Sequence, residues 1–421
     1  QKPNTHTCPV CLGLPGALPV PNKKAIEWCI MIGQALNCNI PLFSKFDRKN
    51  YFYPDLPKGY QISQYDQPFC INGFVEIKGV KLNHPEGVNL NSKKKVRITR
   101  VHMEEDTGKL THETIDGERV SLIDFNRSGV PLVEIVTDPD FDNAEDVKEY
   151  LQRLQQIVRY LEVSNADMEK GDMRLEPNIS LRAEGQKGLP NYKVEVKNIN
   201  SFSFVGKAIE FEIKRQAEIL DKGDTPAQET RGFVESSSST VSQRSKEDAQ
   251  DYRYFPEPDI PPIRWMESQI SNIKSQIPEL PDAKTRRFEQ EYSLSSYESE
   301  ILTREKSLAD YFEKAVADGK KFDIESKKIA NYIINKKPNI EEVLPAQLIQ
   351  NIAKSSQVAS VDERKLSEII DKVLKENPKA VEDYKKGHEN VIMFLVGQVM
   401  RTFPEKVDAS KIKASLLAKL K

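Results

Sequence analysis

The spacing of apolar residues changes near residue 265, and this change limits the possible folds more than any other feature of the sequence. Residues 1–265 are rich in glycine, proline and aromatic residues and contain short segments of alternating apolar and polar residues, a pattern typical of β-strands. From Trp265 onward, apolar residues recur at helical spacing and prolines separate the segments. The sequence therefore predicts an α+β fold in which a region with an antiparallel sheet precedes an all-helical region.

The length of the chain requires more than one hydrophobic core. With 421 residues, it exceeds the roughly 250–300 residues at which a single core stops growing. Asn143 and Ser201 can cap two helices in the N-terminal half, and Asp362 and Ser410 begin two more near the C-terminus. We expect three domains, formed by residues 1–265, 266–353 and 354–421.

The net charge of −2 excludes a uniformly basic nucleic-acid-binding protein, but the charge is unevenly distributed. Residues 354–421 contain 14 Lys or Arg and 10 Asp or Glu, a balance of +4. This basic end favours a polyanionic partner, although a solvated lysine-rich helix explains it equally well. No apolar run approaches the ~20 residues of a membrane-spanning helix, and no signal peptide opens the chain. We therefore expect a cytoplasmic protein that does not bind membranes.

All five cysteines lie within the first 70 residues, where Cys8 and Cys11 have the spacing of half a zinc site. Tetrahedral zinc needs four ligands, and His6 is near enough to supply a third. We expect a structural Zn²⁺ whose remaining ligands lie upstream of the first residue, in a reducing compartment. The other three cysteines have no second paired spacing and are predicted to be small buried apolar residues: Cys29, Cys38 and Cys70.

Two strand-like segments, residues 173–181 and 192–198, carry polar residues on one face only. The two-residue period of a strand separates these polar faces from apolar ones. The polar faces contain Arg174, Glu176, Asn178 and Ser180 in the first segment, and Lys193, Glu195 and Lys197 in the second. Solvated faces of antiparallel sheets show the same pattern, so the pattern alone favours an exposed surface.

A third segment, residues 131–136, is apolar except for Glu134. Strands of this kind are usually buried on both faces, and a buried, unpaired carboxylate is costly. We therefore expect Glu134 to be buried opposite a cation, a metal or a functional cavity. A structural ion pair explains the residue equally well.

Three consecutive acidic residues, Glu104 to Asp106, follow His102 at a predicted strand end. Such residues offer the hard oxygen ligands that Mg²⁺ prefers, although most acidic clusters are solvated turns. No Walker A motif is present here, because Met103 and Leu110 replace its first glycine and its Ser/Thr. Phosphate groups would therefore be bound by side chains and metal rather than by a glycine-rich loop.

Several segments along the chain, taken together, resemble a known family more specifically than any single motif does. The segment Leu14–Asn22 reads LPGALPVPN, and the further segments are residues 44–55, 60–68, 102–109, 124–127, 131–136, 197–202, 228–231, 251–259, 381–384 and 394–400. Together they resemble the GatB family, the B subunits of tRNA-dependent amidotransferases, over nearly the whole chain. The first of them is similar to the family's PGxLPVxN motif.

The resemblance implies a cradle-shaped catalytic domain, a helical domain and a tail that contacts tRNA. It also implies an ATP-dependent ligase reaction on misacylated tRNA. The side-chain carboxylate of the tRNA-linked Glu or Asp is phosphorylated, and ammonia then displaces the phosphate. The ammonia comes from a glutaminase A subunit, in a complex that also contains a C subunit.

By the same resemblance, Glu105, Glu134 and Glu176 match the family's Mg²⁺-binding acids, and Lys49 matches a lysine of its catalytic pocket. Glu176 stands where many relatives have Asp. The residues expected to bind ATP lie on the polar strand faces described above: Arg174, Asn178 and Lys197. The family's opening strand, GLEVH, supplies a further glutamate and a histidine to the metal site and is expected upstream of the first residue.

Two alternatives to this enzyme remain. A tRNA-binding scaffold could keep the fold without catalysis, but a pure scaffold has no reason to retain Lys49, Glu105 and Glu134. The related GatE subunit carries an inserted synthetase-like domain between its cradle and its helices. The chain has no room for such an insertion, which favours the GatB family.

Overall fold

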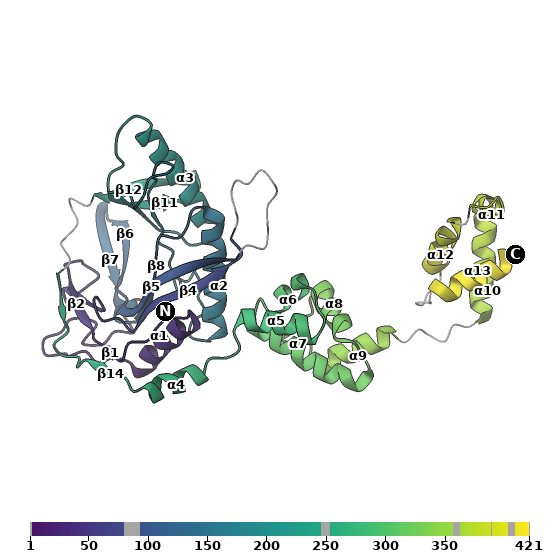
Figure 1. The fold of residues 1–421 in the computed structure, drawn as a ribbon, viewed down its shortest axis with the longest axis horizontal. Coiled ribbons are helices and arrows are strands. Elements are labelled where there is room, and N and C mark those ends of the chain that lie inside the picture. The colour runs from purple at the N-terminus through teal and green to yellow at the C-terminus, as the bar shows by residue number, and fades with distance from the viewer. Residues whose placement is uncertain are drawn as a thin grey trace. The chain divides into compact units, whose positions relative to one another are not determined.

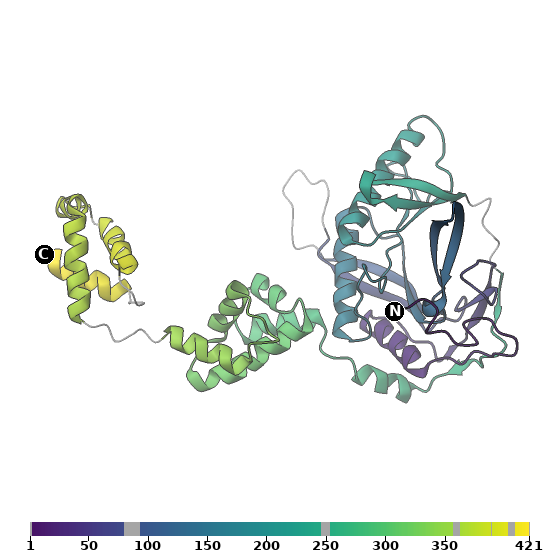
Figure 2. The ribbon, with the colours of Figure 1, turned by 180° about the vertical axis from the view of Figure 1, so that it is seen from behind.

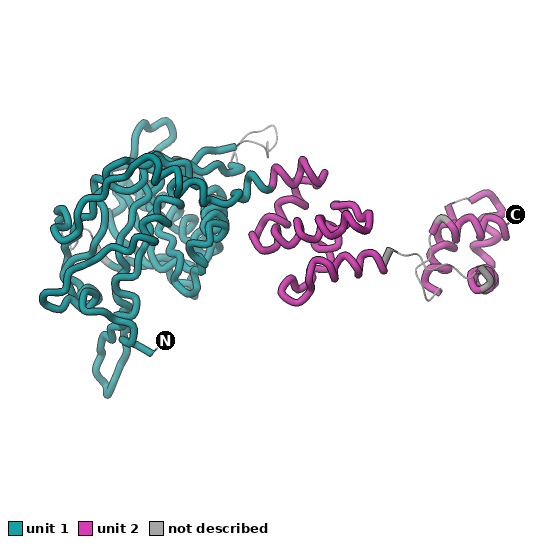
Figure 3. Tube along the Cα trace, turned by 90° about the horizontal axis from the view of Figure 1, so that it is seen from below, with its two compact units in different colours: residues 1–284 teal, residues 285–421 magenta. Residues whose placement is uncertain are grey.

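The computed structural model describes residues 2–79, 93–245, 253–356, 363–388, 390–402 and 409–420 (Figure 1). The chain divides into two compact units, residues 1–284 (unit 1) and 285–421 (unit 2) (Figure 3). Unit 1 combines antiparallel strands with helices and unit 2 is helical, so the predicted α+β fold followed by helices is confirmed. Within the described ranges, no helix is both long and apolar enough to cross a membrane.

The central sheet of unit 1 is antiparallel and has the strand order β4–β5–β8. Its strands are β4 (Cys70–Ile77), β5 (Lys94–Glu105) and β8 (Pro131–Thr137). Helices α1 (Lys23–Ala35), α2 (Ala144–Tyr160) and α4 (Glu267–Ser275) contribute to the same hydrophobic core. This order makes β5 the middle strand and leaves β8 at an edge.

A second antiparallel sheet has the order β13–β2–β3. Its strands are β2 (Asp47–Asn50), β3 (Tyr60–Ser63) and β13 (Arg253–Pro256). Strand β3 packs beside β5, so this sheet adjoins the first. A short pair formed by β1 (Phe43–Ser44) and β14 (Ile263–Arg264) links the start of unit 1 to its end.

A third sheet has the order β12–β11–β10–β9 and is covered on one face by α3 (Phe202–Leu220). Its strands are β9 (Asn178–Ile179), β10 (Val194–Lys197), β11 (Glu229–Val234) and β12 (Ser239–Ser245). Strands β10 and β11 are parallel, the one such pair among the described strands, because α3 forms the crossover between them. Helices α2 and α3 lie side by side (Figure 2).

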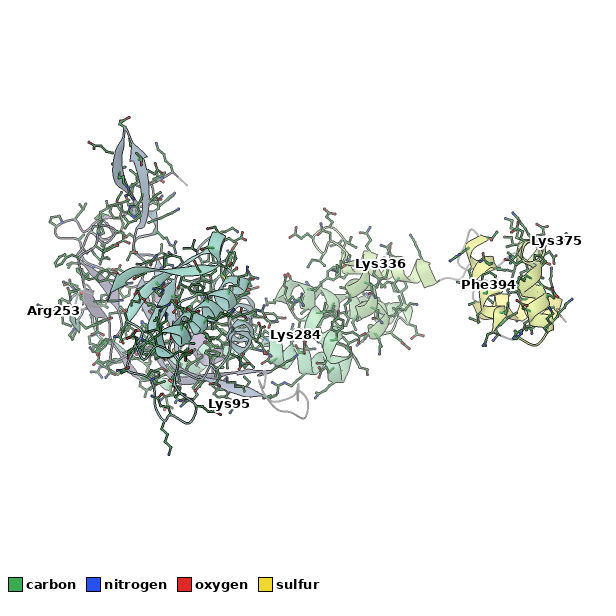
Figure 4. All side chains as sticks on the ribbon, turned by 90° about the horizontal axis from the view of Figure 1, so that it is seen from above. Lys95, Arg253, Lys284, Lys336, Lys375 and Phe394 are labelled. Atoms are coloured by element: carbon green, nitrogen blue, oxygen red, sulfur yellow. The ribbon has the colours of Figure 1, made fainter. Side chains whose placement is uncertain are left out.

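A hairpin of β6 (Lys109–Ile115) and β7 (Glu118–Asp124) projects from unit 1 (Figure 4). Asp116 and Gly117 connect its strands and both have positive φ angles, 51° and 86°. A two-residue turn of this kind matches the twist of the strands on either side. Most residues of the hairpin are exposed, and a short 3-10 helix (Phe125–Arg127) follows it.

The predicted helix starts in unit 1 are confirmed by their caps. Asn143 Oδ1 accepts a hydrogen bond from the Asp146 backbone N–H at 2.8 Å, and Ser201 Oγ accepts one from the Phe204 N–H at 3.1 Å. Helix α1 was not predicted, although Asn22 caps it in the same way. Almost every residue of its second half is buried, so no polar stripe marks it as helical.

The strand predicted over residues 173–181 is mostly irregular. Only Asn178 and Ile179 belong to a strand, and Leu175 forms one isolated bridge. Pro177 has no backbone N–H to donate to a neighbouring strand. The predicted separation of faces is nevertheless observed, since Leu175 and Ile179 are buried while Glu176 is exposed.

Unit 2 consists of helices with two separate groups of buried residues, one within residues 288–352 and one within residues 366–420. The first group belongs to α5 (Pro281–Glu291), α6 (Ser296–Leu302), α7 (Lys306–Gly319), α8 (Ser326–Lys336) and α9 (Pro345–Ser356). The second belongs to α10 (Glu363–Glu376), α11 (Pro378–Lys385), α12 (Val391–Thr402) and α13 (Ala409–Leu420). The predicted cap Asp362 lies outside the described residues. Separate cores support the proposed division into a helical domain and a tail.

Candidate active site

The paired strands β5 and β8 bring an imidazole and two carboxylates together. His102 and Glu134 lie directly opposite each other, and Glu104 follows on the same face of β5. His102 Nε2 lies 3.7 Å from Glu134 Oε2 and 4.0 Å from Glu104 Oε2. The ligand atoms of these three side chains all lie within 4.8 Å of one another, so they could hold a metal ion. Over the described part of the chain, no other group of three or more His, Cys, Asp or Glu side chains does so. We call these three residues the carboxylate–histidine cluster.

The two β5 members of the cluster are buried, and burial opposes their charged forms. Burial raises the pKa of Glu104 to about 7, an effect that Lys49 opposes and Glu134 reinforces. Burial, together with the positive charges of Arg100 and Lys49, lowers the pKa of His102 to about 3. His102 is therefore neutral at pH 7, which is the form in which an imidazole binds a metal ion.

Glu134 is not buried, which corrects the expectation drawn from its apolar neighbours. Its side chain is 46% exposed, because β8 is an edge strand rather than a central one. The protein atoms around it still raise the pKa of its carboxyl group; the positive charges of Lys49 and Arg100 oppose this effect, and the negative charge of Glu176 adds to it. Glu134 thus forms the solvent-facing side of the cluster.

The third sheet brings two more predicted residues toward the cluster. Lys197 Nζ lies 3.2 Å from Glu176 Oε2, and both side chains are partly exposed. Glu176 raises the pKa of Glu134 and Lys197 lowers it, so both lie within electrostatic range of that carboxylate. Lys49, on β2, acts on the pKa of every member of the cluster. The structure thus groups Glu134, Glu176, Lys197 and Lys49. The resemblance assigned roles to these four residues, and those roles stay predictions.

Glu105 does not join this group. Its Oε1 lies 2.6 Å from Lys58 Nζ and accepts a hydrogen bond from the Ile62 backbone N–H at 3.0 Å. Successive residues of a strand point to opposite faces, so only one of Glu104 and Glu105 can face His102. The resemblance assigned Glu105 to the metal site, whereas the acid on the face of His102 is its neighbour Glu104, as the two-residue spacing from His102 indicates.

Arg174 and Asn178 lie near the group without contacting the cluster. Arg174 Nη2 donates to Asp106 Oδ1 at 2.7 Å, and Arg127 Nε donates to Asp106 Oδ2, also at 2.7 Å. The guanidinium group of Arg174 is therefore already engaged. Asn178 is exposed and pairs with Glu195 of β10, on the strand that carries Lys197. A role of either residue in ATP binding stays a prediction.

The Cys8 and Cys11 thiols lie together, with 3.0 Å between their Sγ atoms. His6 lies in the same loop, where its backbone N–H donates to Asn126 Oδ1 at 2.7 Å. In the ranges that the structure describes, no third His, Cys, Asp or Glu completes a metal site with the two thiols. Zinc binding by Cys8 and Cys11 therefore stays a prediction. Of the other cysteines, Cys29 and Cys70 are buried and Cys38 is half-buried.

The raised pKa of Glu104 predicts how stability depends on pH. Folded protein keeps the Glu104 proton up to a pKa of about 7, whereas the unfolded chain loses it near the ordinary value of 4.5. The contribution of this group is therefore fully present below pH 4.5 and is lost as the pH rises to 7. The uncharged Glu104→Gln variant should be more stable than the parent at pH 8 by roughly 3 kcal/mol, and the difference should vanish near pH 4.

Urea denaturation of the full chain with a chelator present measures this difference at both pH values. Glu113→Gln, at an exposed position of β6, is the matched control and should change stability little at either pH. Equal stabilisation by Glu104→Gln at both pH values would contradict the assigned pKa.

Comparison with known proteins places the chain in a family. Residues 1–271 match the GatB/GatE catalytic domain, and residues 323–420 match the GatB domain. The B subunit of the aspartyl/glutamyl-tRNA(Asn/Gln) amidotransferase from Thermoanaerobacter sp. is 45% identical over 451 residues, covering 97% of this chain and 90% of that protein. The proteins of the same name from Thermomicrobium roseum (45% identical; 95% of this chain and 88% of that protein) and Carboxydothermus hydrogenoformans (41% identical; 99% and 92%) are also similar. The chain therefore belongs to the GatB family, the B subunits of aspartyl/glutamyl-tRNA(Asn/Gln) amidotransferases.

Proposed function

We propose that this chain contains the ATP-dependent amidation site of the amidotransferase. The substrate is a tRNA that carries Glu or Asp in place of Gln or Asn. An oxygen of the side-chain carboxylate attacks the γ-phosphorus of ATP, the bond from that phosphorus to the bridging oxygen breaks, and ADP leaves. Ammonia then attacks the acyl carbon, phosphate leaves with the former carboxylate oxygen, and the nitrogen loses a proton.

The observation that supports this proposal most strongly is the carboxylate–histidine cluster, with two lysines within electrostatic range of it. Two carboxylates and one neutral imidazole form a donor set that fits a divalent cation. The raised pKa values of Glu104 and Glu134 indicate that the protein alone compensates their negative charge incompletely. We therefore propose that His102, Glu104 and Glu134 hold Mg²⁺, which when bound would offset the charge of the phosphates.

The remaining residues bind and orient the substrates. Lys49 and Lys197 carry ammonium groups that can bind anionic oxygens of ATP or of the carboxylate substrate. Glu176 limits the freedom of Lys197 by pairing with it at 3.2 Å. Glu105 is left out of the proposed metal site because its carboxylate pairs with Lys58 on the opposite face of β5.

The proposal includes partners for the chain. Its relatives are named as one subunit of an amidotransferase, and such a name describes a component of a multi-subunit enzyme. We propose an A subunit that produces ammonia from glutamine, a C subunit that completes a heterotrimer, and a tRNA contact made by helices α10 to α13. A cytoplasmic location and a structural zinc ion belong to the same set of proposals.

Amidation assays on the assembled complex test this function. Given glutamine and each misacylated tRNA, the complex should form Gln-tRNA or Asn-tRNA when ATP is added and should form neither without ATP. The alternative is a non-catalytic tRNA-binding scaffold of the same fold. Full activity of a complex in which both Glu104 and Glu134 are replaced by glutamine would support the scaffold and contradict the proposed site.

A further inference from the structure

The sheet β9–β12 presents two chemically different faces. One face of β10 and β11 packs into the core beneath α3. The alternate residues of β10, Glu195 and Lys197, point to the other face, and Thr230 of β11 lies directly opposite Glu195. These three polar side chains therefore share the face on which Lys197 meets Glu176.

A chain of contacts on this face ends at Lys197. Thr230 Oγ1 donates a hydrogen bond to Glu195 Oε2 at 3.0 Å. Glu195 Oε1 lies 3.7 Å from Lys197 Nζ, which lies 3.2 Å from Glu176 Oε2. Lys197 is therefore shared between two carboxylates, and a hydroxyl on the neighbouring strand fixes one of them.

The opposite face of β11 holds Thr230 in place. The residues on either side of it, Glu229 and Arg231, point toward α3, where Arg231 Nη1 lies 2.7 Å from Glu229 Oε1. Arg231 Nε also lies 3.2 Å from Glu212 Oε1, on a side chain with no solvent exposure. A buried network of ion pairs and hydrogen bonds is rigid. Strand β11 therefore presents the Thr230 hydroxyl from a fixed position.

Sharing between two carboxylates determines where the ammonium group of Lys197 can lie. A lysine side chain is flexible, and it orients a substrate oxygen only when its ammonium group is held. If Glu195 were free to turn away, the attraction of Glu176 and Glu134 would draw Lys197 toward them. The lysine would then neutralise the acids instead of contacting a substrate.

We propose that Glu195, oriented by Thr230, is a positioning residue that holds Lys197 Nζ where it contacts a phosphate oxygen of ATP. The inference rests on the proposed function, since it assigns Lys197 to ATP. Neither Glu195 nor Thr230 has to touch ATP. Loss of either side chain should therefore raise the KM for ATP and leave the KM for misacylated tRNA unchanged.

Thr230→Val tests this proposal in the assembled complex, because valine keeps the shape of threonine and removes the hydroxyl. We expect the KM for ATP to rise roughly five- to tenfold while the KM for misacylated tRNA stays the same. Thr230→Ser restores the hydroxyl and should return the KM for ATP to within about twofold of the parent. Thr114→Val, the same change at an exposed position of β6, is the matched control and should not change the KM for ATP.

A double-mutant cycle with Lys197→Met separates positioning from a merely structural role. If Thr230 acts through Lys197, adding Thr230→Val to Lys197→Met should raise the KM for ATP no further. Additive effects, or a normal KM for ATP in a folded Thr230→Val complex, would overturn the proposal. The Glu134→Gln variant shows whether the proposed function fails as well. If the KM for ATP of Thr230→Val is normal but Glu134→Gln is inactive in the same assays, only this inference is wrong. If Glu134→Gln and Lys197→Met both have the activity of the parent, the proposed function is wrong too.

Discussion

Replacing Glu134 by glutamine is expected to reduce ATP-dependent amidation by roughly 100- to 1,000-fold, since a catalytic metal contributes several kcal/mol to transition-state stabilisation. The change keeps the shape of the side chain and removes its charge. It takes one of two carboxylates from the carboxylate–histidine cluster, where His102 Nε2 lies 3.7 Å from Glu134 Oε2. Raising the Mg²⁺ concentration should restore part of the activity, because the remaining ligands still bind the ion.

The stability of the protein should not fall with the activity. Glu134 is 46% exposed on an edge strand, so its removal leaves no buried cation without a partner. Its pKa is raised by the surrounding protein and by Glu176, so the loss of its charge relieves repulsion between the two acids. We therefore expect the unfolding free energy of Glu134→Gln to equal or slightly exceed that of the parent.

Amidation rates and denaturation curves, measured on the same complex, distinguish the roles of Glu134. Glu118→Gln, at an exposed position of β7, is the matched control and should leave both quantities unchanged. Activity that falls only in proportion to the loss of folded protein would indicate a structural ion pair. A folded and fully active Glu134→Gln complex would remove Glu134 from the mechanism.

Deleting residues 363–421 is expected to weaken tRNA binding by at least about tenfold at physiological salt, because basic side chains that neutralise phosphates provide much of the affinity of such contacts. Residues 363–421 contain 13 Lys or Arg and 9 Asp or Glu, a balance of +4 within a protein whose net charge is −2. Helix α12 also exposes Met393, Phe394 and Met400, and Phe394 lies at the surface of the tail (Figure 4). Gly397 of the same helix faces open space.

The deletion should reduce tRNA binding and leave the other properties of the complex unchanged. The buried residues within 288–352 form a core that shares no member with the core of α10 to α13, so the remaining helices keep their packing. The tRNA-independent glutaminase activity of the complex should stay near normal, and the dependence of tRNA affinity on salt should become less steep.

Single charge reversals refine this test. Lys413→Glu, in α13, should weaken tRNA binding, whereas Lys314→Glu, at an exposed position of α7, is the control outside the tail. An unchanged tRNA affinity of the deletion variant at physiological salt would reduce the basic tail to a solvated surface.

Local signals predicted the parts of the fold that depend on neighbouring residues. The caps Asn143 and Ser201 begin helices where expected, because a side-chain acceptor in front of an apolar stripe is sufficient to position a helix start. Helix α1 was missed because almost every residue of its second half is buried, so no polar stripe marks that half as helical. Pairing between distant strands, such as the parallel β10 and β11, depends on the whole chain and leaves no local pattern.

The candidate site was predicted only in part for the same reason. Lys49, Glu134, Glu176 and Lys197 come together as the resemblance implied. The exposure of Glu134 follows from strand order, and apolar neighbours in the sequence do not reveal whether a strand lies at an edge. The two-residue period of β5 places Glu104, rather than Glu105, on the face of His102, and this spacing is visible in the sequence.

The central claim, that the tRNA-linked carboxylate is phosphorylated before it is amidated, can be tested by following its oxygen atoms. The assembled complex would be given ATP, glutamine and misacylated tRNA whose side-chain carboxylate is labelled with ¹⁸O. We expect each released phosphate to carry one ¹⁸O atom, because the carboxylate oxygen that attacks the γ-phosphorus leaves with the phosphate. We also expect Glu134→Gln to stop the release of labelled phosphate. Amidation that yields only unlabelled phosphate would contradict the acyl phosphate route and the role assigned to the site.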